Sequence, residues 1–418
     1  MTHLKNKLHF WELENLNCYV WLKRDFWKLL VKKKNDKKLT WFEVSKKISI
    51  NYGSLRNYLG QLNNTKKAQF IPLDILIKLL NQFDIKLKII EKNNWLAKIR
   101  SGKSGSSKPS NGSIFPINFL KEDWGSFIGA LLSECHIKDT GEINFSNKDI
   151  ELIKNFINFS NELTGLKETV KTYKRKNGKV YFYVNYPEIV GKILIRGLEI
   201  KLGKKTIQNP PIPPIYLNSN NFEIIGHLLS WLFSGDGWIT IFKDHLGQTH
   251  RAIGICFGSS KKDQIPQLLL DTMMLLDKLN IKYNKPFQEI KTTKKGKITY
   301  SWKIFIKGEN NFVKFRERVN FATIDKRKKL DKMINSYVKP KLGNNESFLL
   351  VVNSVNKISK IKGYATKHDI CETAKLNKKW VEKILKRAVD RNCIKIVGGG
   401  ERCRNEYGRV PYFYVSGE

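Results

Sequence analysis

Two apolar runs stand out in the pattern of hydrophobic and polar positions, and each of them ends on a carboxylate. The first run, Phe127 to Ser133, leads to Glu134, and the second, Leu229 to Gly235, leads to Asp236. Neither run alternates between apolar and polar residues, which predicts a buried helix rather than a strand with one solvated face. The interval between the two acids is the length of a small subdomain. The pattern therefore predicts two halves related by pseudo-symmetry, each contributing one acid to a shared place.

The sequence after each acid predicts the same series of elements. In both halves a short β-rich stretch precedes an amphipathic helical pattern, and two further β-rich runs follow around a turn, Asn177-Gly178 or Lys295-Gly296. Asn-Gly between β-rich runs is a strong hairpin signal. The predicted helices are 150–163 and 266–279, and the predicted strands are 170–174, 180–186, 285–291 and 298–307. Each half is therefore predicted to run helix, strand, strand, helix, strand, strand, helix.

The position of the two acids predicts a cation site. The C-terminal end of a helix carries partial negative charge, so a carboxylate there costs roughly 0.3–1 kcal/mol unless a cation lies beside it. Two such ends side by side offer carboxylate and carbonyl oxygens, which are the ligands that Mg²⁺ prefers. Small residues four positions apart, Gly129 and Ser133 in one helix and Ser230 and Ser234 in the other, predict that the two backbones approach closely.

Composition narrows the class of partner. The chain has 418 residues and carries 76 Lys and Arg against 38 Asp and Glu, a formal net charge of +38 that is spread over all its parts. Such a chain attracts phosphate, so a nucleic acid is the expected partner. Its six cysteines include no C-x-x-C pair, which argues against a zinc ribbon or a disulfide framework. No run approaches the ~18 apolar residues of a membrane span, so we expect no membrane partner. The scattered cysteines favour a reducing compartment, so we expect a cytoplasmic protein. A monomer is the expected oligomeric state.

The N-terminal part, residues 1–100, is predicted to be a helical domain. Helices are predicted at 41–48, 52–62 and 72–83. Their spacing is typical of a helix-turn-helix domain in which Arg56 and Asn57 contact bases or phosphates, and a plain helical bundle is the alternative. Residues 101–114 are rich in Ser, Gly and Lys and predict a flexible basic linker.

The C-terminal part, residues 342–418, is predicted to be a winged-helix domain. Helical patterns at 348–361, 367–374 and 378–391 are followed by β-rich runs at 393–397 and 410–415. The third helix carries the candidate DNA contacts Lys379, Lys383 and Arg387, and the turn between the strands carries Arg402, Arg404 and Arg409. DNA binding is the expected role, and protein contact is the alternative.

The paired motifs resemble the LAGLIDADG (dodecapeptide) homing endonuclease family in its single-chain, two-repeat form. The resemblance covers a first repeat at 115–215 and a second at 216–341. It implies an α+β fold of two αββαββα repeats whose antiparallel saddle sheets face DNA. It also implies site-specific double-strand cleavage by phosphodiester hydrolysis with Mg²⁺ or Mn²⁺. Glu134 and Asp236 match the family's catalytic, metal-binding acids, and the carbonyl groups of Ser133 and Gly235 would add ligands.

The family also places a basic residue near each active centre, at the end of a strand. Lys307 is the catalytic candidate in the second half, and Lys303, on the same face of the same predicted strand, is a candidate DNA contact. The matching place in the first half lies near Asn185, which is not basic. Lys174 and Arg175, at the end of the preceding strand, are expected to contact phosphate.

Three departures from the family pattern keep other functions open. Glu134 replaces the commoner Asp, Cys135 stands where Gly usually follows the acid, and Trp231 stands where a small residue often packs. One alternative is a DNA-binding regulator that has lost cleavage. The other is a maturase that binds structured intron RNA.

Overall fold

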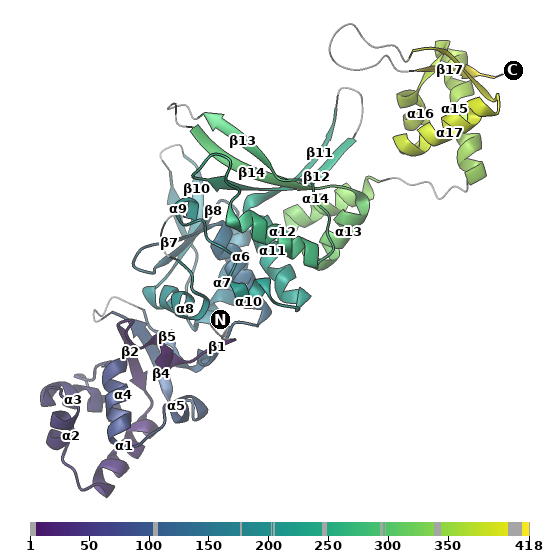
Figure 1. Ribbon diagram of the computed structural model, residues 1–418. Helices are drawn as coiled ribbons and strands as arrows, with labels where there is room; N and C mark the ends of the chain where they lie inside the picture. Colours follow the sequence, from purple (N-terminus) through teal and green to yellow (C-terminus); the bar gives the residue numbers. More distant parts are fainter. Residues whose placement is uncertain are drawn as a thin grey trace. The chain divides into compact units, whose positions relative to one another are not determined.

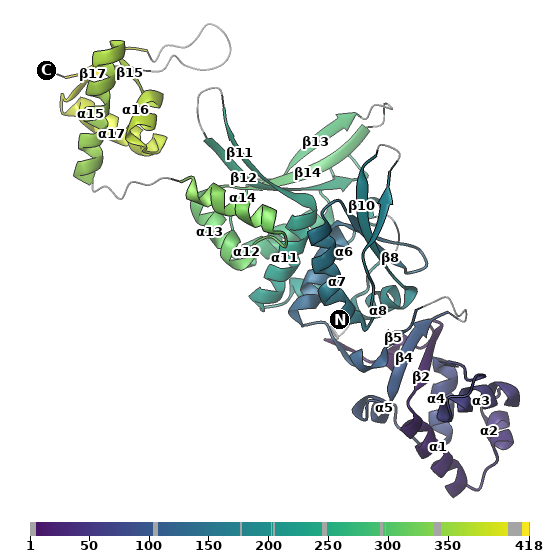
Figure 2. The ribbon, with the colours of Figure 1, turned by 180° about the vertical axis from the view of Figure 1, so that it is seen from behind.

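Helices and antiparallel sheets make up the structure, a computed structural model, in agreement with the predicted mixture of both (Figures 1 and 2). It describes residues 6–102, 108–175, 178–201, 203, 205–244, 249–292, 296, 298–337, 344–399 and 412–417. The chain divides into two compact units. One comprises Met1–Ile239 and Ala252–Lys328, and the other Thr240–Arg251 and Lys329–Glu418. No helix in these described ranges is long and apolar enough to cross a membrane.

The first central half has the element order that the sequence predicts. Its elements are α6 (Glu122–Ser133), β7 (Cys135–Ile137), β8 (Ile143–Asn147), α7 (Ile150–Thr164), β9 (Lys171–Lys174), β10 (Val180–Tyr186) and α8 (Glu188–Leu198). The strands form an antiparallel sheet in the order β7-β8-β10-β9. Helix α7 begins where Asp149 accepts a hydrogen bond from the Glu151 amide, and it ends at Gly165, whose φ of 63° suits glycine.

The second central half repeats this order. Its elements are α11 (Phe222–Asp236), β11 (Gly237–Lys243), β12 (Thr249–Ser259), α12 (Gln267–Lys278), β13 (Phe287–Thr292), β14 (Ile298–Ile306) and α13 (Glu309–Arg318), followed by α14 (Ile324–Asn335). The sheet order β11-β12-β14-β13 matches that of the first half. Gly178 and Gly296 have φ of 79° and 76°, as the predicted hairpin turns require, while Asn177 and Lys295 lie outside the described residues. Two short helices, α9 (Lys205–Gln208) and α10 (Pro214–Leu217), connect the halves.

The N-terminal part contains a sheet as well as the predicted helices. The helices α2 (Trp41–Lys47), α3 (Tyr52–Leu59) and α4 (Leu73–Gln82) match the prediction and are accompanied by α1 (Arg24–Asp36) and α5 (Lys88–Lys92). A four-stranded sheet has the order β3-β2-β4-β5, with β2 at Cys18–Leu22, β3 at Ile71–Pro72, β4 at Leu96–Ser101 and β5 at Ser110–Asn111. The prediction of a purely helical domain is therefore wrong. Strands β3 and β5 are two residues long and too short to show alternation, whereas β2 alternates in burial, β4 does so in part, and the sequence analysis missed both.

The predicted flexible linker at 101–114 is in part an ordered segment. Strand β5 pairs with β4, with Ile99 opposite Ser110, and Ser110 is buried. A Cβ on Gly112 would lie 2.4 Å from Cγ of Leu96, so this position packs closely as well. Residues 103–107 lie outside the described residues. The segment after them belongs to the fold of the larger unit.

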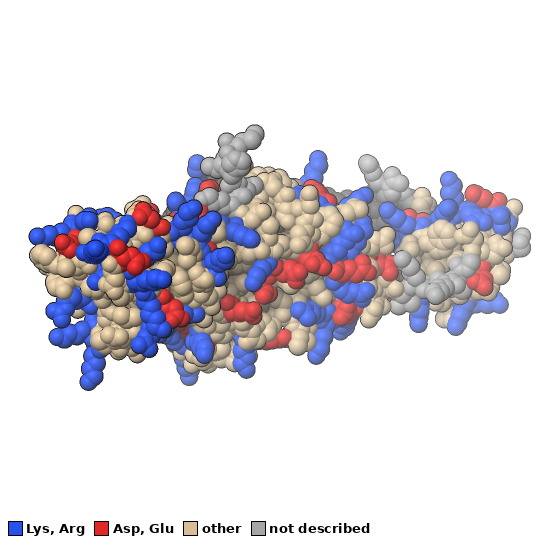
Figure 3. Space-filling view, turned by 90° about the horizontal axis from the view of Figure 1, so that it is seen from below, with Lys and Arg blue, Asp and Glu red and all other residues tan. Residues whose placement is uncertain are grey.

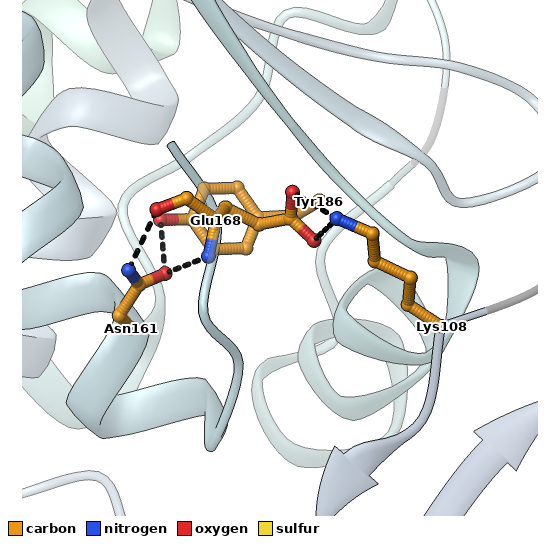
Figure 4. A network of polar contacts seen from close by, with 4 residues as sticks. All are labelled: Lys108, Asn161, Glu168 and Tyr186. Carbon is orange, nitrogen blue, oxygen red and sulfur yellow. Dashed lines mark hydrogen bonds and ion pairs between the residues drawn. The ribbon is translucent and has the colours of Figure 1, made fainter. Parts of the chain in front are cut away.

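A polar network joins this segment to the first central half (Figure 4). Lys108 donates to both carboxylate oxygens of the buried Glu168, at 2.9 and 2.8 Å. The Asn161 side chain accepts from the Glu168 amide at 3.0 Å and donates to the Glu168 carbonyl at 2.9 Å. The Tyr186 hydroxyl donates to the same Asn161 oxygen at 3.3 Å. Asn161 thus satisfies polar groups from two separate segments.

We expect Asn161→Ala to destabilise the larger unit by about 2 kcal/mol, because it leaves buried backbone groups of Glu168 without partners. Asn158 lies exposed on the same helix, and Asn158→Ala should change stability by no more than about 0.5 kcal/mol. Urea unfolding of both variants measures the difference. Equal losses would show that the network contributes nothing specific.

The smaller unit contains a separate α-helical and β-sheet domain at the C-terminus. It runs α15 (Asn344–Lys362), β15 (Ala365–Thr366), α16 (Lys367–Ala374), α17 (Lys378–Asp390), β16 (Ile394–Gly398) and β17 (Phe413–Ser416), with the sheet order β15-β17-β16. Asn377 caps α17 by accepting from the Trp380 amide at 2.9 Å. Arg402, Arg404 and Arg409, predicted on the connecting turn, lie outside the described residues.

Candidate active site

Helices α6 and α11 pack with their backbones in direct contact at the centre of the larger unit (Figures 1 and 2). A Cβ added to Gly129 would lie 2.2 Å from the carbonyl oxygen of Leu228, and one added to Gly125 would lie 2.6 Å from that of Ile224. Only glycine permits this approach. The predicted close contact of the two helices is therefore present.

The small residues of α11 have a different role from the predicted one. Ser234 donates to the Ser230 carbonyl at 2.6 Å and accepts from the Ala322 amide at 2.7 Å, so it faces a loop and not α6. The α11 side of the contact instead carries Trp231, whose Cβ lies 2.9 Å from a Cβ built on Gly129. The prediction of matching stripes is thus correct for α6 and wrong for α11.

Trp231 reaches from α11 into the core of the first half. Its ring lies 5.2 Å from Phe159, 6.0 Å from Phe156 and 6.3 Å from Phe145, measured between ring centroids. The missing side chain of Gly129 makes room for this indole. Trp231 therefore fixes the two halves to each other, and its bulk is compatible with the helix contact.

The two acids come together where the helices end. Glu134 is the C-cap residue of α6, and Asp236 is the last residue of α11. A Cβ built on Gly235 would lie 2.6 Å from Cβ of Ser133 and 2.9 Å from Cγ of Glu134, so the two helix ends touch. The predicted meeting of one acid from each half is present in the structure.

Burial raises the pKa of both carboxylates above their ordinary values. Burial is the main cause that raises the pKa of Glu134, and Lys205, Lys326 and a hydrogen bond with Asn147 oppose it. Burial also raises the pKa of Asp236 to about 7, with a further contribution from the neighbouring Glu134 charge, while both lysines lower it. Two half-buried carboxylates that repel each other favour a proton or a metal ion between them.

Two lysines that the sequence analysis missed complete the site. Lys205 of α9 donates to the Ser133 carbonyl at 2.6 Å. Lys326 of α14 donates to the carbonyl groups of Ser234 and Gly237, at 2.6 and 2.7 Å. Each ammonium thus caps the C-terminal end of one central helix, where the helix dipole favours a cation.

The two lysines occupy corresponding places in the two halves. Lys205 follows α8, the last helix of the first half, and Lys326 follows α13, the last helix of the second. Burial lowers the pKa of Lys205, while Cys135 and both acids raise it. The sequence does contain a lysine after the third helix of each half. No neighbouring residue, however, indicates that this lysine binds the end of a helix far away in the sequence.

The basic residues that the sequence analysis selected lie elsewhere. Lys307 follows the last residue of β14, with its Nζ 5.8 Å from the Phe305 ring centroid, and no described contact joins it to either acid. Lys303 forms an ion pair with Glu289 at 2.6 Å and lies 5.7 Å from the Trp238 ring centroid. Lys303 lies on the face of β14 opposite to the buried Ile304 and Ile306, and its contact with DNA stays a prediction.

The outward face of the first sheet carries tyrosines with cations over them. The rings of Tyr173 and Tyr181 stack with centroids 5.5 Å apart, and Tyr183 meets Tyr173 edge-on at 5.6 Å. The guanidinium of Arg175 lies 4.1 Å and the ammonium of Lys148 5.5 Å from the Tyr181 centroid. Lys174 precedes Arg175 at the end of β9 and is exposed. Cations beside flat aromatic rings suit contact with phosphates and base or sugar edges.

The outward face of the second sheet differs in chemistry. Trp238 and Phe305 pack edge to face there, and a Cβ on Gly254 would lie 2.5 Å from the Trp238 ring. Glu289 forms ion pairs with Lys303 at 2.6 Å and with Lys291 at 2.9 Å, and these neighbours lower its pKa. This face is therefore more apolar, and part of its positive charge is neutralised.

The remaining predicted contacts lie on the flanking domains. Arg56 is exposed on α3, and Asn57, next to it, is half-buried. On α17, Lys379 and Lys383 are exposed, whereas Arg387 is half-buried with its guanidinium 5.8 Å from the Phe348 ring centroid. These positions are compatible with the predicted contacts and leave them as predictions.

The donor set fits a small, hard divalent cation. The described residues contain no cluster of three or more His, Cys, Asp or Glu that would form a metal site from side chains alone. Two neighbouring carboxylates with helix-end carbonyl oxygens are nevertheless the ligand type of Mg²⁺, which keeps several waters. Of the predicted carbonyl ligands, that of Ser133 already accepts from Lys205. Burial raises the pKa of the Cys135 thiol to about 12, and sulfur is a soft donor that Mg²⁺ does not prefer.

Comparisons with known proteins give structural neighbours only. No family model and no curated protein matches the chain. Full-length DUF199/WhiA from Thermatoga maritima is 13% identical with a TM-score of 0.33, and the match covers 66% of this chain and 94% of that one. The homing endonuclease I-WcaI, bound to its DNA recognition sequence, is 16% identical with a TM-score of 0.33, covering 59% and 92%. I-DmoI in complex with DNA and Mn is 14% identical with a TM-score of 0.29, covering 47% and 96%.

Likeness at this level carries no information about activity. A further neighbour is the N-terminal LAGLIDADG domain of DUF199/WhiA, at 14% identity and a TM-score of 0.29. These neighbours are LAGLIDADG homing endonucleases and the LAGLIDADG-like DUF199/WhiA domain, the family that the two motifs resemble.

Proposed function

We propose that the central region is a pair of LAGLIDADG repeats acting as a site-specific, Mg²⁺-dependent DNA endonuclease. The observation that carries this proposal is the meeting of Glu134 and Asp236 at the abutting ends of α6 and α11. Bound Mg²⁺ would neutralise the charge that develops on the scissile phosphate. The carbonyl groups of Ser133 and Gly235 are the proposed further ligands.

The chain's own residues hold this site rigid. The backbone contact at Gly129 and the insertion of Trp231 fix the distance between the halves, so each acid is held by a helix and not by a loop. Half-burial keeps water from screening the carboxylates, which strengthens their attraction for a cation. The role of Lys307 as a catalytic residue stays a prediction. Lys205 and Lys326, which bond to the helix ends, are the better-supported basic residues of the site.

The partner proposed for both sheets is double-stranded DNA. Lys174, Arg175 and Lys303 lie at or on the outward faces, where antiparallel strands present alternate side chains to a ligand. On the face of the molecule in Figure 3, Lys and Arg side chains occur along the whole visible surface, with Asp and Glu between them. The formal net charge of +38 attracts a polyanion such as duplex DNA.

The flanking domains are proposed to extend the DNA contact. Residues 1–100 and 342–418 would act as helix-turn-helix-like and winged-helix-like modules, with α3 and α17 as the candidate reading helices. Helix, strand, helix, helix, strand, strand is the order of elements in the C-terminal domain, which supports the second assignment. The exposed lysines of α17 would contact phosphates.

Replacing Lys379 and Lys383 together by alanine is expected to weaken DNA binding and to lower the slope of log K against log salt concentration by about 2, one phosphate contact each. Lys362→Ala is the control, since Lys362 pairs with Asp369 at 2.9 Å outside α17. Fluorescence anisotropy at several salt concentrations measures both slopes. An unchanged slope in the double variant would assign the C-terminal domain to protein contact.

The nuclease itself is tested with randomised duplex libraries. The protein is incubated with the library and Mg²⁺, and the new DNA ends are sequenced. Recurrent double-strand ends at one sequence are expected. Tight binding without cuts in either Mg²⁺ or Mn²⁺ would contradict the nuclease, and selective binding of structured intron RNA would point to a maturase.

One observation favours a second function, DNA binding without cleavage. The ammonium groups of Lys205 and Lys326 already bond to carbonyl groups at the ends of both central helices. A regulator derived from a nuclease would benefit from such contacts, because they balance the two acids without a metal. The library experiment separates the two functions.

A further inference from the structure

Four ionisable side chains lie within electrostatic range of one another at the ends of the central helices, two acidic and two basic. Glu134 and Asp236 supply two carboxylates, and Lys205 and Lys326 supply two ammonium groups. Both lysines act on both acids, since each lowers the pKa of Glu134 and of Asp236. The lysines come from outside the two motif helices, one from each half of the central region.

The ammonium groups also occupy the places that a cation would take at the helix ends. Lys205 lies 2.6 Å from the Ser133 carbonyl oxygen. Lys326 lies 2.6 Å from the Ser234 oxygen, 2.7 Å from the Gly237 oxygen and 3.3 Å from the Phe233 oxygen. These three carbonyl oxygens accept from all three N–H donors of the Lys326 ammonium group. Lys326 therefore bonds to the oxygens that a metal ion at this helix end would bind.

A pair of bare carboxylates at this place would repel a DNA phosphate. Opposite charges within a partly buried cluster attract more strongly than in water, and like charges repel more strongly for the same reason. Proteins that place two acids against a nucleic acid backbone must balance them with a cation. The cations here belong to the chain.

We propose that Lys205 and Lys326 are built-in cations of the central site, which take the place of divalent metal at the two helix ends and allow the central region to hold a DNA phosphate without metal. The proposal rests on the proposed DNA binding but does not require cleavage. It implies that a divalent ion competes with the two ammonium groups for the carbonyl and carboxylate oxygens.

The first test measures metal binding without DNA. The full chain and its Lys205→Met, Lys326→Met double variant are titrated with Mn²⁺ by calorimetry. The variant is expected to bind Mn²⁺ at least about tenfold more tightly, because two nearby positive charges are gone and the oxygens are free. Adding Glu134→Gln and Asp236→Asn to the variant should remove the gain. The proposal would be overturned if the unaltered chain bound Mn²⁺ as tightly as the double variant does.

A matched control comes from a third lysine with the same kind of bond. Lys278 donates to the Ser219 carbonyl at 3.0 Å and also to that of Leu217, and it is not among the groups that act on either acid. Lys278→Met should leave Mn²⁺ binding unchanged. If the double variant fails to fold without metal, each single variant is titrated instead, and each should bind about threefold more tightly than the unaltered chain.

The second test measures DNA binding with and without metal. The unaltered chain should bind a random duplex equally well in EDTA and in Ca²⁺. The double variant should bind about tenfold more weakly in EDTA and regain affinity in Ca²⁺. An unaltered chain that needs Ca²⁺ to bind DNA would overturn the proposal. If the chain shows these binding results but does not cut DNA in Mg²⁺, only the proposed nuclease function is contradicted. If it cuts DNA but the double variant does not bind Mn²⁺ more tightly, only the proposal of built-in cations is contradicted.

Discussion

Gly129→Ala is expected to destabilise the central region by about 3 kcal/mol, at the upper end of what overpacking costs. The added Cβ would lie 2.2 Å from the Leu228 carbonyl oxygen and 2.9 Å from Cβ of Trp231, where ordinary contact begins at 3.4 Å. Neither neighbour is the far end of a flexible side chain, so the helices themselves must separate. Separation would also move Glu134 away from Asp236 and impair any activity of the site.

Hydrogen exchange followed by mass spectrometry locates this effect in the chain. Peptides from α6 and α11 should exchange faster in Gly129→Ala, and peptides from the C-terminal domain should not change. Gly53→Ala in α3 is the control, because the only atom that its Cβ would meet is the side-chain oxygen of Asn51 at 3.0 Å. Unchanged exchange in α6 and α11 would show that the helix contact has more room than the structure gives it.

The parts of the fold that sequence reasoning predicted are those with local signals. Helix α7 lies within a residue of its predicted end because Asp149 caps it and Gly165 terminates it. The acids were identifiable because the motif occurs twice, so that each copy supports the other. The hairpin after β9 followed from Asn177-Gly178.

The parts that escaped prediction depend on contacts between distant residues. Lys205 and Lys326 look like ordinary surface lysines until the fold brings them to the ends of other helices. The packing of Trp231 against Gly129 likewise depends on two facing helices, so neither residue alone predicts it. Lys307 was chosen from its place at a strand end, a criterion that carries no information about which direction the side chain takes.

Asp236→Asn is expected to reduce cleavage of the target by about a thousandfold or more, because it removes one of the two charged ligands of the proposed metal site. The shape of the side chain is kept, so the helix ends should stay in contact. Burial already opposes the charge of Asp236, as its pKa of about 7 indicates. The amide should therefore not lower the stability of the metal-free protein.

Asp277→Asn serves as the matched control for this prediction. Asp277 is a carboxylate at the end of another helix of the same half, α12, where it accepts from the Tyr283 hydroxyl at 2.8 Å. Cleavage rates are compared at saturating protein, and duplex binding is measured in EDTA for both variants. The Asp236 variant should keep its binding, since removing one acid lowers the negative charge near the phosphate and leaves the positive charge of the two lysines in place. Loss of binding together with cleavage would mean that Asp236 holds the fold, whereas unchanged cleavage would move the chemistry away from these helix ends.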